Sequence, residues 1–328
     1  MKKYLSIFAC FVLLLMSSCT NDEIPVGKAI TFTINPGTVV QGLYEIDPGE
    51  LTSIKNDEKL YVSLYVYNTD GALVCSDTQK LSSYSEKMIT TLGLEYGNYT
   101  LVAVTRIIKD NGTNFWEISD TDRLYNLTIT NTGSIGLGSK ILGLSTQKIT
   151  VEESTQSIYM DVKIAGAVAA VKFENWNGNQ NISIYGIATN KKSESISLNE
   201  NGDLIPSIVT FDDLRFVFFA TTYKPTMTGD HGYQFMFPCE NAKMSFATFK
   251  LNNERFQLTS YLGENETMSF ERGHSYLFTY DVASKKATWE DMTKQTRTEG
   301  EDMKYQDSIY VVNGLEYNSA ERSIKIAQ

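Results

Sequence analysis

The chain has 328 residues, a length that predicts about two domains of ordinary size. Hydrophobic residues make up 42 % of it and charged residues 21 %, a balance that excludes a disordered chain and a polytopic membrane protein. Lysine and arginine together number 29 against 39 aspartates and glutamates, so the net charge of −10 argues against a nucleic-acid partner.

The first 18 residues have the pattern of a signal peptide. Two lysines stand near the start, and an apolar run extends from Tyr4 to Met16. As a helix this run would span about 20 Å, short of the roughly 30 Å hydrocarbon core of a membrane. The sequence Leu-Met-Ser-Ser-Cys that follows resembles a bacterial lipobox, in which the cysteine is acylated. We predict a lipoprotein signal peptide over residues 1–18 and lipid attachment at Cys19. The alternative is an ordinary secretory signal with a chance cysteine.

Residues 19–28 are predicted to be a tether. Within them, the sequence Thr-Asn-Asp-Glu resembles the acidic segment that directs lipoproteins of Bacteroides-type bacteria to the outer cell surface. The expected location is therefore the outer membrane, with the chain held by its lipid and facing outward. A plain polar tether is the other interpretation of the same residues.

Short runs of β-branched and aromatic residues with period-two alternation predict an N-terminal β-sandwich over residues 29–155. Asn68-Thr69-Asp70-Gly71 predicts a tight turn, because Asp and Gly tolerate positive φ. The expected strands are 29–35, 59–68, 72–76, 86–92, 98–107 and 124–130. In the second of these, alternation separates an apolar face from a face bearing Tyr61, Tyr65 and Tyr67.

The same pattern predicts a second β-sandwich over residues 156–290. Asn252-Asn253 between two alternating runs indicates a hairpin turn. The expected strands are 157–164, 167–173, 182–188, 215–220, 233–238, 245–251, 256–261 and 274–282.

Residues 291–328 are predicted to be a polar linker followed by a terminal hairpin. Residues 291–306 are almost entirely polar, whereas 308–312 and 323–326 have strand-like composition. Two interpretations of residues 308–328 remain open, namely a strand donated to a neighbouring subunit and a hairpin folded back on its own domain. The expected fold class is all-β, with two tandem sandwiches and a C-terminal hairpin extension.

Two cysteines remain once Cys10 leaves with the leader and Cys19 is acylated. Cys75 and Cys239 fall in different predicted domains. A disulfide between them and two buried free thiols are the alternatives, and the free thiols are favoured.

Three segments stand out for their alternation, namely residues 60–74 (LYVSLYVYNTDGALV), 96–104 (YGNYTLVAV) and 162–173 (VKIAGAVAAVKF). They resemble segments of the fimbrillin and Mfa2/FimB-type anchor superfamily of Bacteroides-related bacteria. The resemblance implies two tandem sandwiches of transthyretin-like topology, exported as a lipoprotein that forms or anchors surface pili. It also implies that polymerising members lose an N-terminal strand to an arginine-specific protease, so that a partner's strand can enter the groove. Here the first arginine is Arg106, deep in the first predicted domain, which favours an anchor or accessory subunit.

Catalytic and metal-binding patterns are weak throughout. Only two histidines are present, His231 and His274, and neither accompanies a nucleophile elbow or a metal-ligand spacing. Asp120-x-Asp122 and Asp212-Asp213 lack the rest of a calcium loop and are interpreted as solvated turn carboxylates. The run from Gly136 to Lys140 resembles a phosphate loop only superficially. We therefore expect no enzyme activity, no cofactor and no metal.

The aromatic content of 12 % also fits a glycan-binding surface. The candidates for stacking on sugar rings are Trp116, Trp176 and Trp289 and the outward stripe of Tyr61, Tyr65 and Tyr67; core packing is the plainer explanation for all of them.

The expected function is that of a fimbrial anchor, accessory or adhesin subunit that assembles by β-strand addition. Its expected partners are other pilus subunits, the outer membrane through its lipid, and a host or bacterial surface receptor. The alternative is a surface glycan-binding lipoprotein that serves polysaccharide uptake.

Overall fold

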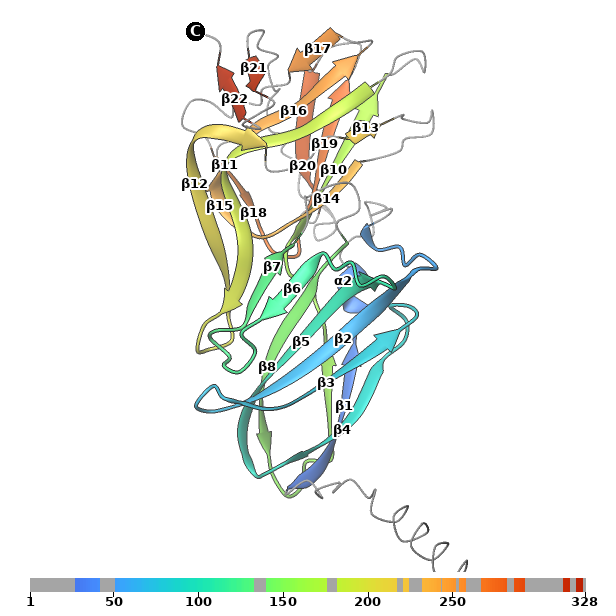
Figure 1. Ribbon diagram of the computed structural model, residues 1–328, viewed down its shortest axis with the longest axis vertical. Coiled ribbons are helices and arrows are strands. Elements are labelled where there is room, and N and C mark those ends of the chain that lie inside the picture. Colours follow the sequence, from blue (N-terminus) through green and yellow to red (C-terminus); the bar gives the residue numbers. More distant parts are fainter. Residues whose placement is uncertain are drawn as a thin grey trace, which may run out of the picture.

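The computed structural model describes most of the chain after its N-terminal segment. The described residues are 27–41, 51–132, 140–175, 182–216, 221–223, 232–242, 244–251, 254–257, 267–281, 286–292, 315–318 and 323–326. Within them the chain is almost entirely β-structure, arranged as two lobes stacked along the long axis (Figure 1). The predicted all-β fold class is confirmed.

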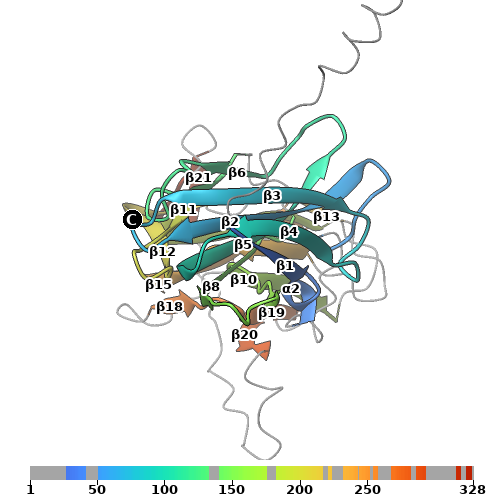
Figure 2. The same ribbon diagram turned by 90° about the horizontal axis from the view of Figure 1, so that it is seen from below.

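The first lobe is a sandwich of two sheets. A four-stranded antiparallel sheet has the order β3-β2-β5-β8, and a three-stranded sheet has the order β4-β1-β9. Figure 2 views this lobe from its free end. Its elements are β1 (Lys28–Asn35), α2 (Thr38–Gln41), β2 (Glu58–Asn68), β3 (Leu73–Leu81), β4 (Met88–Leu94), β5 (Gly97–Lys109), β8 (Gly143–Val151) and β9 (Ser157–Asp161).

Alternation places the apolar residues of these strands between the two sheets, as the sequence predicts. The inward residues of β1 and β2 are completely buried, namely Ile30, Phe32, Ile34, Leu60, Val62, Leu64 and Val66. They join one hydrophobic core that extends into the second lobe.

The second lobe contains a four-stranded sheet of order β14-β10-β19-β20 and a larger sheet that includes β17-β16-β11-β12-β22-β21. Its strands are β10 (Ala167–Glu174), β11 (Ile182–Leu198), β12 (Leu204–Phe216), β13 (Thr221–Tyr223), β14 (Gly232–Met236), β15 (Cys239–Ala242), β16 (Met244–Leu251), β17 (Glu254–Gln257), β18 (Met268–Phe270), β19 (Ser275–Asp281), β20 (Lys286–Asp291), β21 (Leu315–Asn318) and β22 (Ser323–Ile326). β16 and β17 pair antiparallel with Leu251 opposite Glu254, and the residues of the expected hairpin turn, Asn252 and Asn253, lie outside the described residues.

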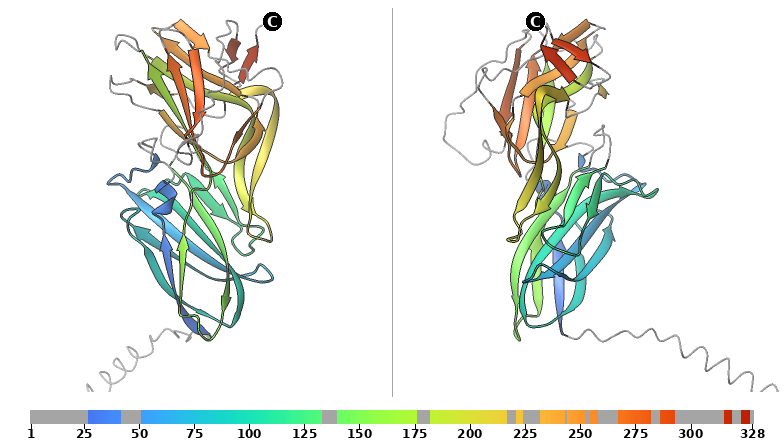
Figure 3. Two further views of the ribbon diagram at one scale, coloured as in Figure 1. Left: turned by 180° about the vertical axis from the view of Figure 1, so that it is seen from behind. Right: turned by 60° about the vertical axis from the view of Figure 1, so that its left-hand side comes forward.

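A long arm links the lobes. β11 and β12 form an antiparallel hairpin whose tip descends along the first lobe (Figures 1 and 3). The short strands β6 (Trp116–Ser119) and β7 (Thr128–Asn131) pair with each other, and β7 also pairs with β11. The sequence predicts only residues 182–188 and 215–220 as strands here. The rest of the arm is mostly polar, and its inward face is short, with Ile196 and Leu198 buried, so periodicity over a long window does not reveal it.

Side-chain contacts also join the lobes. The indole of Trp116 lies 5.1 Å, centroid to centroid, from each of Phe235 and Phe237. The guanidinium of Arg272 in the second lobe donates to the backbone carbonyl of Ile164 at 2.9 Å and to that of Leu144. The lobes therefore share packing as well as backbone pairing.

The sequence predicts a boundary between two domains at residue 155, and the pairing of β9 indicates where the first lobe ends. β9 runs parallel to β1 and lies in the three-stranded sheet of the first lobe. Met160 in β9 is 3 % exposed and Val162, just after the strand, is completely buried, whereas Ile158 is half-buried. Because β10 is the first strand of the next sheet, we place the boundary close to residue 165.

Within the part of the chain that the structure describes, no helix has the length and hydrophobicity needed to cross a membrane.

Candidate functional site

The first strand of the structure occupies a slot between two others. β1 pairs antiparallel with β4, from Lys28 opposite Leu94 to Ile34 opposite Met88. On its other edge it pairs parallel with β9, from Thr31 opposite Ser157 onward. A strand with a partner on each side has both rows of backbone groups satisfied, so β1 completes this sheet rather than bordering it.

The alternation of KAITFTIN explains why this segment fits the slot. Ile30, Phe32 and Ile34 point into the core and are completely buried, whereas Thr31 and Thr33 between them are half-buried on the outer face. Burial of each such apolar side chain contributes about 1.5–3 kcal/mol. These three side chains therefore provide most of the hydrophobic energy that holds β1 in place.

Polar contacts fasten β1 at both ends. At the start, Lys28 Nζ donates to the carbonyls of Glu152 and Glu153. At the end, Asn35 Nδ2 donates to Asp161 Oδ1 at 2.7 Å, while Asn35 Oδ1 accepts from the amide of Gly37 at 3.1 Å. The hydroxyl of Thr38, in the α2 turn that follows, donates to the carbonyl of Val162.

This arrangement is suited to recognition by β-strand addition. Without β1, the facing edges of β4 and β9 would present unpaired backbone groups above an exposed apolar floor. An incoming strand with apolar residues at alternate positions would restore both. The sequence predicts β1 as a strand, but its position inside the sheet depends on pairing with β9. These two strands are more than 120 residues apart along the chain, and the Thr31 amide donates to the Gln156 carbonyl between them.

The C-terminal hairpin lies on the edge of the larger sheet. β21 and β22 pair antiparallel, with Leu315 opposite Ile326 and Asn318 opposite Ser323. Among the described residues, β22 meets β12 at one register position, Ser323 opposite Arg215. The strand predicted at 323–326 is confirmed, the second strand of the hairpin is β21 at Leu315–Asn318, and the strand expected at 308–312 lies outside the described residues. In the described residues the hairpin thus meets its own chain at this one position, and donation of residues 308–328 to a neighbouring subunit stays a prediction.

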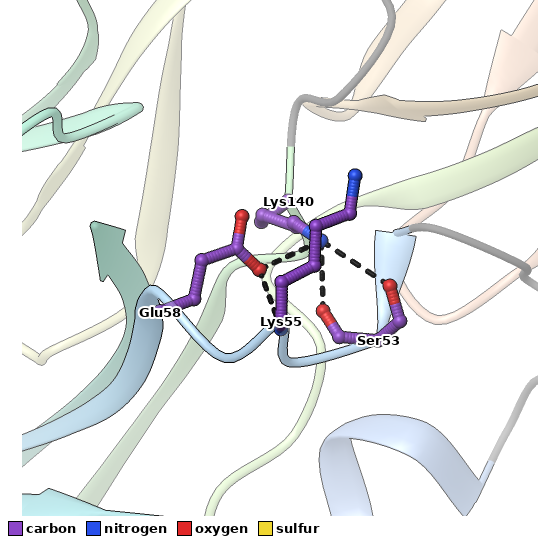
Figure 4. Close-up of polar contacts among 4 residues, drawn as sticks. All are labelled: Ser53, Lys55, Glu58 and Lys140. Atoms are coloured by element: carbon purple, nitrogen blue, oxygen red, sulfur yellow. Dashed lines mark hydrogen bonds and ion pairs between the residues drawn. The ribbon is translucent and has the colours of Figure 1, made fainter. Parts of the chain in front are cut away.

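A buried ion pair closes the end of the first lobe near α2 (Figure 4). Lys140 Nζ lies 3.1 Å from Glu58 Oε2, and the same amine donates to the Ser53 carbonyl at 2.7 Å. Glu58 Oε2 in turn accepts from the backbone amide of Lys55 at 2.9 Å. The hydroxyl of Tyr84 has its pKa raised by burial and by the nearby charge of Glu58. Lys140 thus has a structural role, which the superficial likeness of residues 136–140 to a phosphate loop does not predict.

Of the three cysteines with a predicted role, Cys75 and Cys239 lie in the described part of the chain and Cys19 does not. The lipid-attachment residue Cys19 and the whole leader and tether up to residue 26 lie outside the described residues. Cys75 is half-buried in β3 and Cys239 is buried in β15, and both are free thiols. Burial raises the pKa of Cys75 to about 11 and also raises that of Cys239.

The expected outward stripe of tyrosines is corrected by the structure. Tyr67 is completely buried, and its hydroxyl donates to the carbonyl of Thr121 at 2.9 Å. Tyr65 is half-buried against the core, and Tyr61 is half-buried beneath the amine of Lys80, which lies 5.3 Å from the ring centroid. Because Tyr67 is buried and the other two rings are half-buried, this face of β2 is not an outward aromatic stripe.

The tryptophans do not form a platform either. Trp116 is 1 % exposed, and its indole nitrogen donates to the carbonyl of Lys140 at 2.8 Å. Trp289 lies in β20, and Trp176 lies outside the described residues. The plainer explanation, core packing, therefore holds for Trp116.

The remaining polar candidates are dispersed. His274 is half-buried, with Nδ1 2.9 Å from Asp291 Oδ2, whereas His231 lies outside the described residues. Asp120 and Asp122 are exposed turn residues as expected, but Asp212 lies within β12 rather than in a turn. Among the residues that the structure describes, no three side chains of the histidine, cysteine, aspartate or glutamate type could together hold a metal ion.

No protein-family profile matches the sequence, and no curated protein sequence matches it. Solved structures that are similar include three from related bacteria. A proposed cell adhesion protein from Bacteroides uniformis is 12 % identical, with 80 % of this chain and 95 % of that chain covered and a TM-score of 0.47. The tip fimbrial protein Mfa3 from Porphyromonas gingivalis, with a C-terminal truncation, is 9 % identical, with coverages of 80 % and 98 % and a TM-score of 0.45. A fimbrial assembly protein from Parabacteroides distasonis is 12 % identical, with coverages of 82 % and 97 % and a TM-score of 0.41. At this similarity the likeness concerns the arrangement of strands and not the function.

Proposed function

We propose that this chain is a cell-surface lipoprotein that acts as a fimbrial anchor, accessory or adhesin subunit and assembles by β-strand addition. Its lipid would be attached at Cys19, which would hold it at the outer membrane with both lobes outside. The work of such a protein is mechanical rather than catalytic. Its partners are then other pilus subunits, joined through backbone edges.

The observation that carries this proposal is the slot filled by β1. The strand lies between β4 and β9 with Ile30, Phe32 and Ile34 buried beneath it. The slot shows how this fold holds a strand with apolar residues at alternate positions by backbone pairing on both edges, which is the form that a neighbouring subunit must offer to a donated strand. The names of the similar solved structures, two of them fimbrial proteins, are in keeping with this use.

The sequence around β1 favours an anchor or accessory subunit over a shaft subunit. No arginine precedes Arg106, so a protease specific for arginine has no site at which to release β1. The chain would then keep both its strand and the lipid attached ahead of it. In this proposal the slot stays closed, and the chain joins a neighbour by lending a strand instead of receiving one.

The segment to be lent is the C-terminal one, residues 308–328. In the described residues its hairpin touches β12 at the single position of Arg215 and Ser323, whereas β11 and β12 pair along the whole arm. Release of such a hairpin costs little backbone pairing. Entry into a neighbour's slot would then add pairing along both edges of the strand.

Deletion of the chain from the bacterium that makes it tests the proposal. We expect fimbriae that are detached, shortened or lost, and recovery when the full chain is restored. The Cys19→Ala variant should be made but should fail to hold fimbriae to the cell. A variant that ends at Gln306 should fold and carry lipid, yet fail to join other subunits. Normal fimbriae in the deletion strain would contradict the proposal. Normal assembly by the truncated chain would show that residues 308–328 are not the donated strand.

The slot itself can be tested on the purified chain. A protease site inserted within residues 42–50 allows β1 and α2 to be cut from the remainder after folding. A labelled peptide of residues 28–41 should then replace the cut strand, and the same peptide with Phe32→Asp should not. A Thr33→Ser peptide is the matched control, because Thr33 lies on the outer face and the exchange should persist. Failure of the native peptide to enter the cut protein would contradict a slot that accepts strands.

A further inference from the structure

A groove lies where the arm reaches the first lobe. It has a volume of about 700 Å³ and is lined by the β2–β3 turn, the first residues of β5, the end of β8, the loop before β7 and the tip of the arm. Figures 1 and 3 show the turn and the arm tip on the same side of the molecule. The volume falls within the range of small-molecule sites, roughly 300–1,000 Å³. Because five segments from both lobes build it, local sequence does not indicate it.

The turn on one side of the groove is held rigidly. Asn68 Oδ1 accepts from the amides of Asp70 and Ala72 at 3.1 and 2.9 Å. Gly71 has a φ of 73°, in the left-handed region that favours glycine. The chain there is also fixed from outside, since Arg123 Nη1 donates to the Asp70 carbonyl at 3.2 Å.

The arm tip on the other side is held in the same way. Asn199 Oδ1 accepts from the amides of Asn201 and Asp203 at 2.9 and 2.8 Å. The hydroxyl of Thr146 in β8 donates to the Gly202 carbonyl at 2.9 Å, which ties the tip to the first lobe. Both sides are thus fixed before any ligand arrives, and a preorganised site loses less entropy on binding.

An aromatic ring lies at the edge of the groove. Tyr125 is 44 % exposed, and its ring lies against Gly71, where an added Cβ would come within 3.2 Å of it. Tyr125 also lines the groove, so part of its side chain is accessible from it. A flat, partly exposed ring with fixed support offers a stacking surface for the apolar face of a sugar.

Polar groups of complementary kinds lie around this ring. Asp70 and Glu200 supply carboxylate acceptors, and Lys148 supplies an amine donor. Among the described residues these three side chains have no hydrogen-bond or ionic partner. Asn98 accepts from the Thr150 hydroxyl through Oδ1 at 2.8 Å, which leaves its amide nitrogen as a donor.

We propose that this groove binds a neutral carbohydrate. A sugar presents hydroxyls that donate and accept, together with a weakly polar ring face, and the groove offers acceptors, donors and an aromatic surface within one cavity. Two carboxylates against one lysine disfavour an anionic sugar, and the net charge of −10 acts in the same direction. Strand addition does not involve this groove, so the inference does not rest on the proposed function.

Binding can be measured on the chain from Thr20 onward. An array of neutral oligosaccharides built from galactose, mannose, fucose and N-acetylglucosamine is the first probe, with sialylated and sulfated oligosaccharides as the acidic arm. We expect binding in the neutral arm, and then a fall in affinity of about tenfold or more for Tyr125→Ala and for Asp70→Asn, measured by calorimetry with the best neutral oligosaccharide.

The matched control is Tyr159→Ala. Tyr159 is 47 % exposed on the three-stranded sheet of the first lobe and does not line the groove. Its replacement should leave the affinity within about twofold of the unchanged chain. Absence of binding to every neutral sugar, binding confined to the acidic arm, or full affinity in Tyr125→Ala would each overturn the proposal. Fimbrial phenotypes do not enter this test, so its failure and that of the proposed function are separate.

Discussion

Lys140 and Glu58 form an ion pair that is almost completely shielded from solvent. Their nitrogen and oxygen lie 3.1 Å apart, and the side chains are 2 % and 1 % exposed. The pair joins the first residue of β2 to the segment before β8, two parts of the chain that meet only in the folded state. Removal of one charge would leave the other buried without its partner, at a cost of about 3–5 kcal/mol.

We therefore expect Lys140→Met to lower the free energy of unfolding by about 3–5 kcal/mol. The double variant Lys140→Met/Glu58→Leu should recover much of that loss, because apolar side chains of similar volume can replace a buried pair. Urea unfolding of Lys140→Met, Glu58→Leu and the double variant gives the coupling free energy between the two charges. Simple additivity of the single effects would show that the two charges do not depend on each other.

Phe32 should be the most sensitive residue of β1. It is completely buried at the centre of the strand, so Phe32→Ala should cost about 3–5 kcal/mol through lost burial and the cavity left behind. Thr33→Ala on the outer face is the comparison and should cost less than about 1 kcal/mol. The same urea assay measures both variants. Equal effects would mean that the slot does not hold β1 through its inward side chains.

The thiol of Cys75 should react slowly at neutral pH. Burial raises its pKa from an ordinary value of 9.0 to about 11, and only the thiolate is nucleophilic. In the Cys239→Ser chain lacking Cys19, alkylation at pH 8 should be roughly a hundredfold slower than that of a free cysteine, and should accelerate about tenfold per pH unit up to pH 10. The same chain unfolded in urea should react at the ordinary rate.

The raised pKa of Cys75 also makes the free energy of unfolding depend on pH. Below pH 9 the thiol is protonated in both the folded and the unfolded chain and has no differential effect. Between about pH 9 and 11 the unfolded chain releases this proton and the folded chain does not, so the free energy of unfolding should fall as the pH rises. A Cys75→Ser chain should show a smaller fall over that interval. An identical pH dependence of the two chains would contradict the assignment.

Arg272 should contribute to the attachment of the lobes. Its guanidinium donates to carbonyls of Ile164 and Leu144, which belong to the first lobe. Charge-assisted hydrogen bonds of this kind suggest a loss of about 1–2 kcal/mol in Arg272→Ala, with Arg272→Lys intermediate. Arg123→Ala, which removes a bond within the first lobe, is the control and should have a smaller effect. An unchanged midpoint of unfolding for Arg272→Ala would indicate that the shared core alone joins the lobes.

Local patterns in the sequence were sufficient for many individual elements. Alternation in residues 29–35 and 59–68 indicates which side chains face inward, and Ile30, Phe32 and Leu64 are indeed buried. The turn at Asn68–Gly71 follows from residues that favour tight turns, and the antiparallel pairing of β16 with β17 is in keeping with the hairpin expected there. These features depend on neighbours within a few positions, so a single sequence contains the information.

The sequence alone determined that this protein is built of alternating strands and indicated its resemblance to fimbrial proteins, whereas the lipoprotein leader stays a prediction. Only the tertiary structure placed β1 between β4 and β9, extended the polar arm across the first lobe, buried Tyr67 and Lys140, and assembled the groove beside Tyr125. The physical reason is that alternation specifies which face of a strand is apolar and leaves open which edge will meet it. Edges are paired by backbone hydrogen bonds that every residue except proline can make, so their choice depends on the packing of the whole chain.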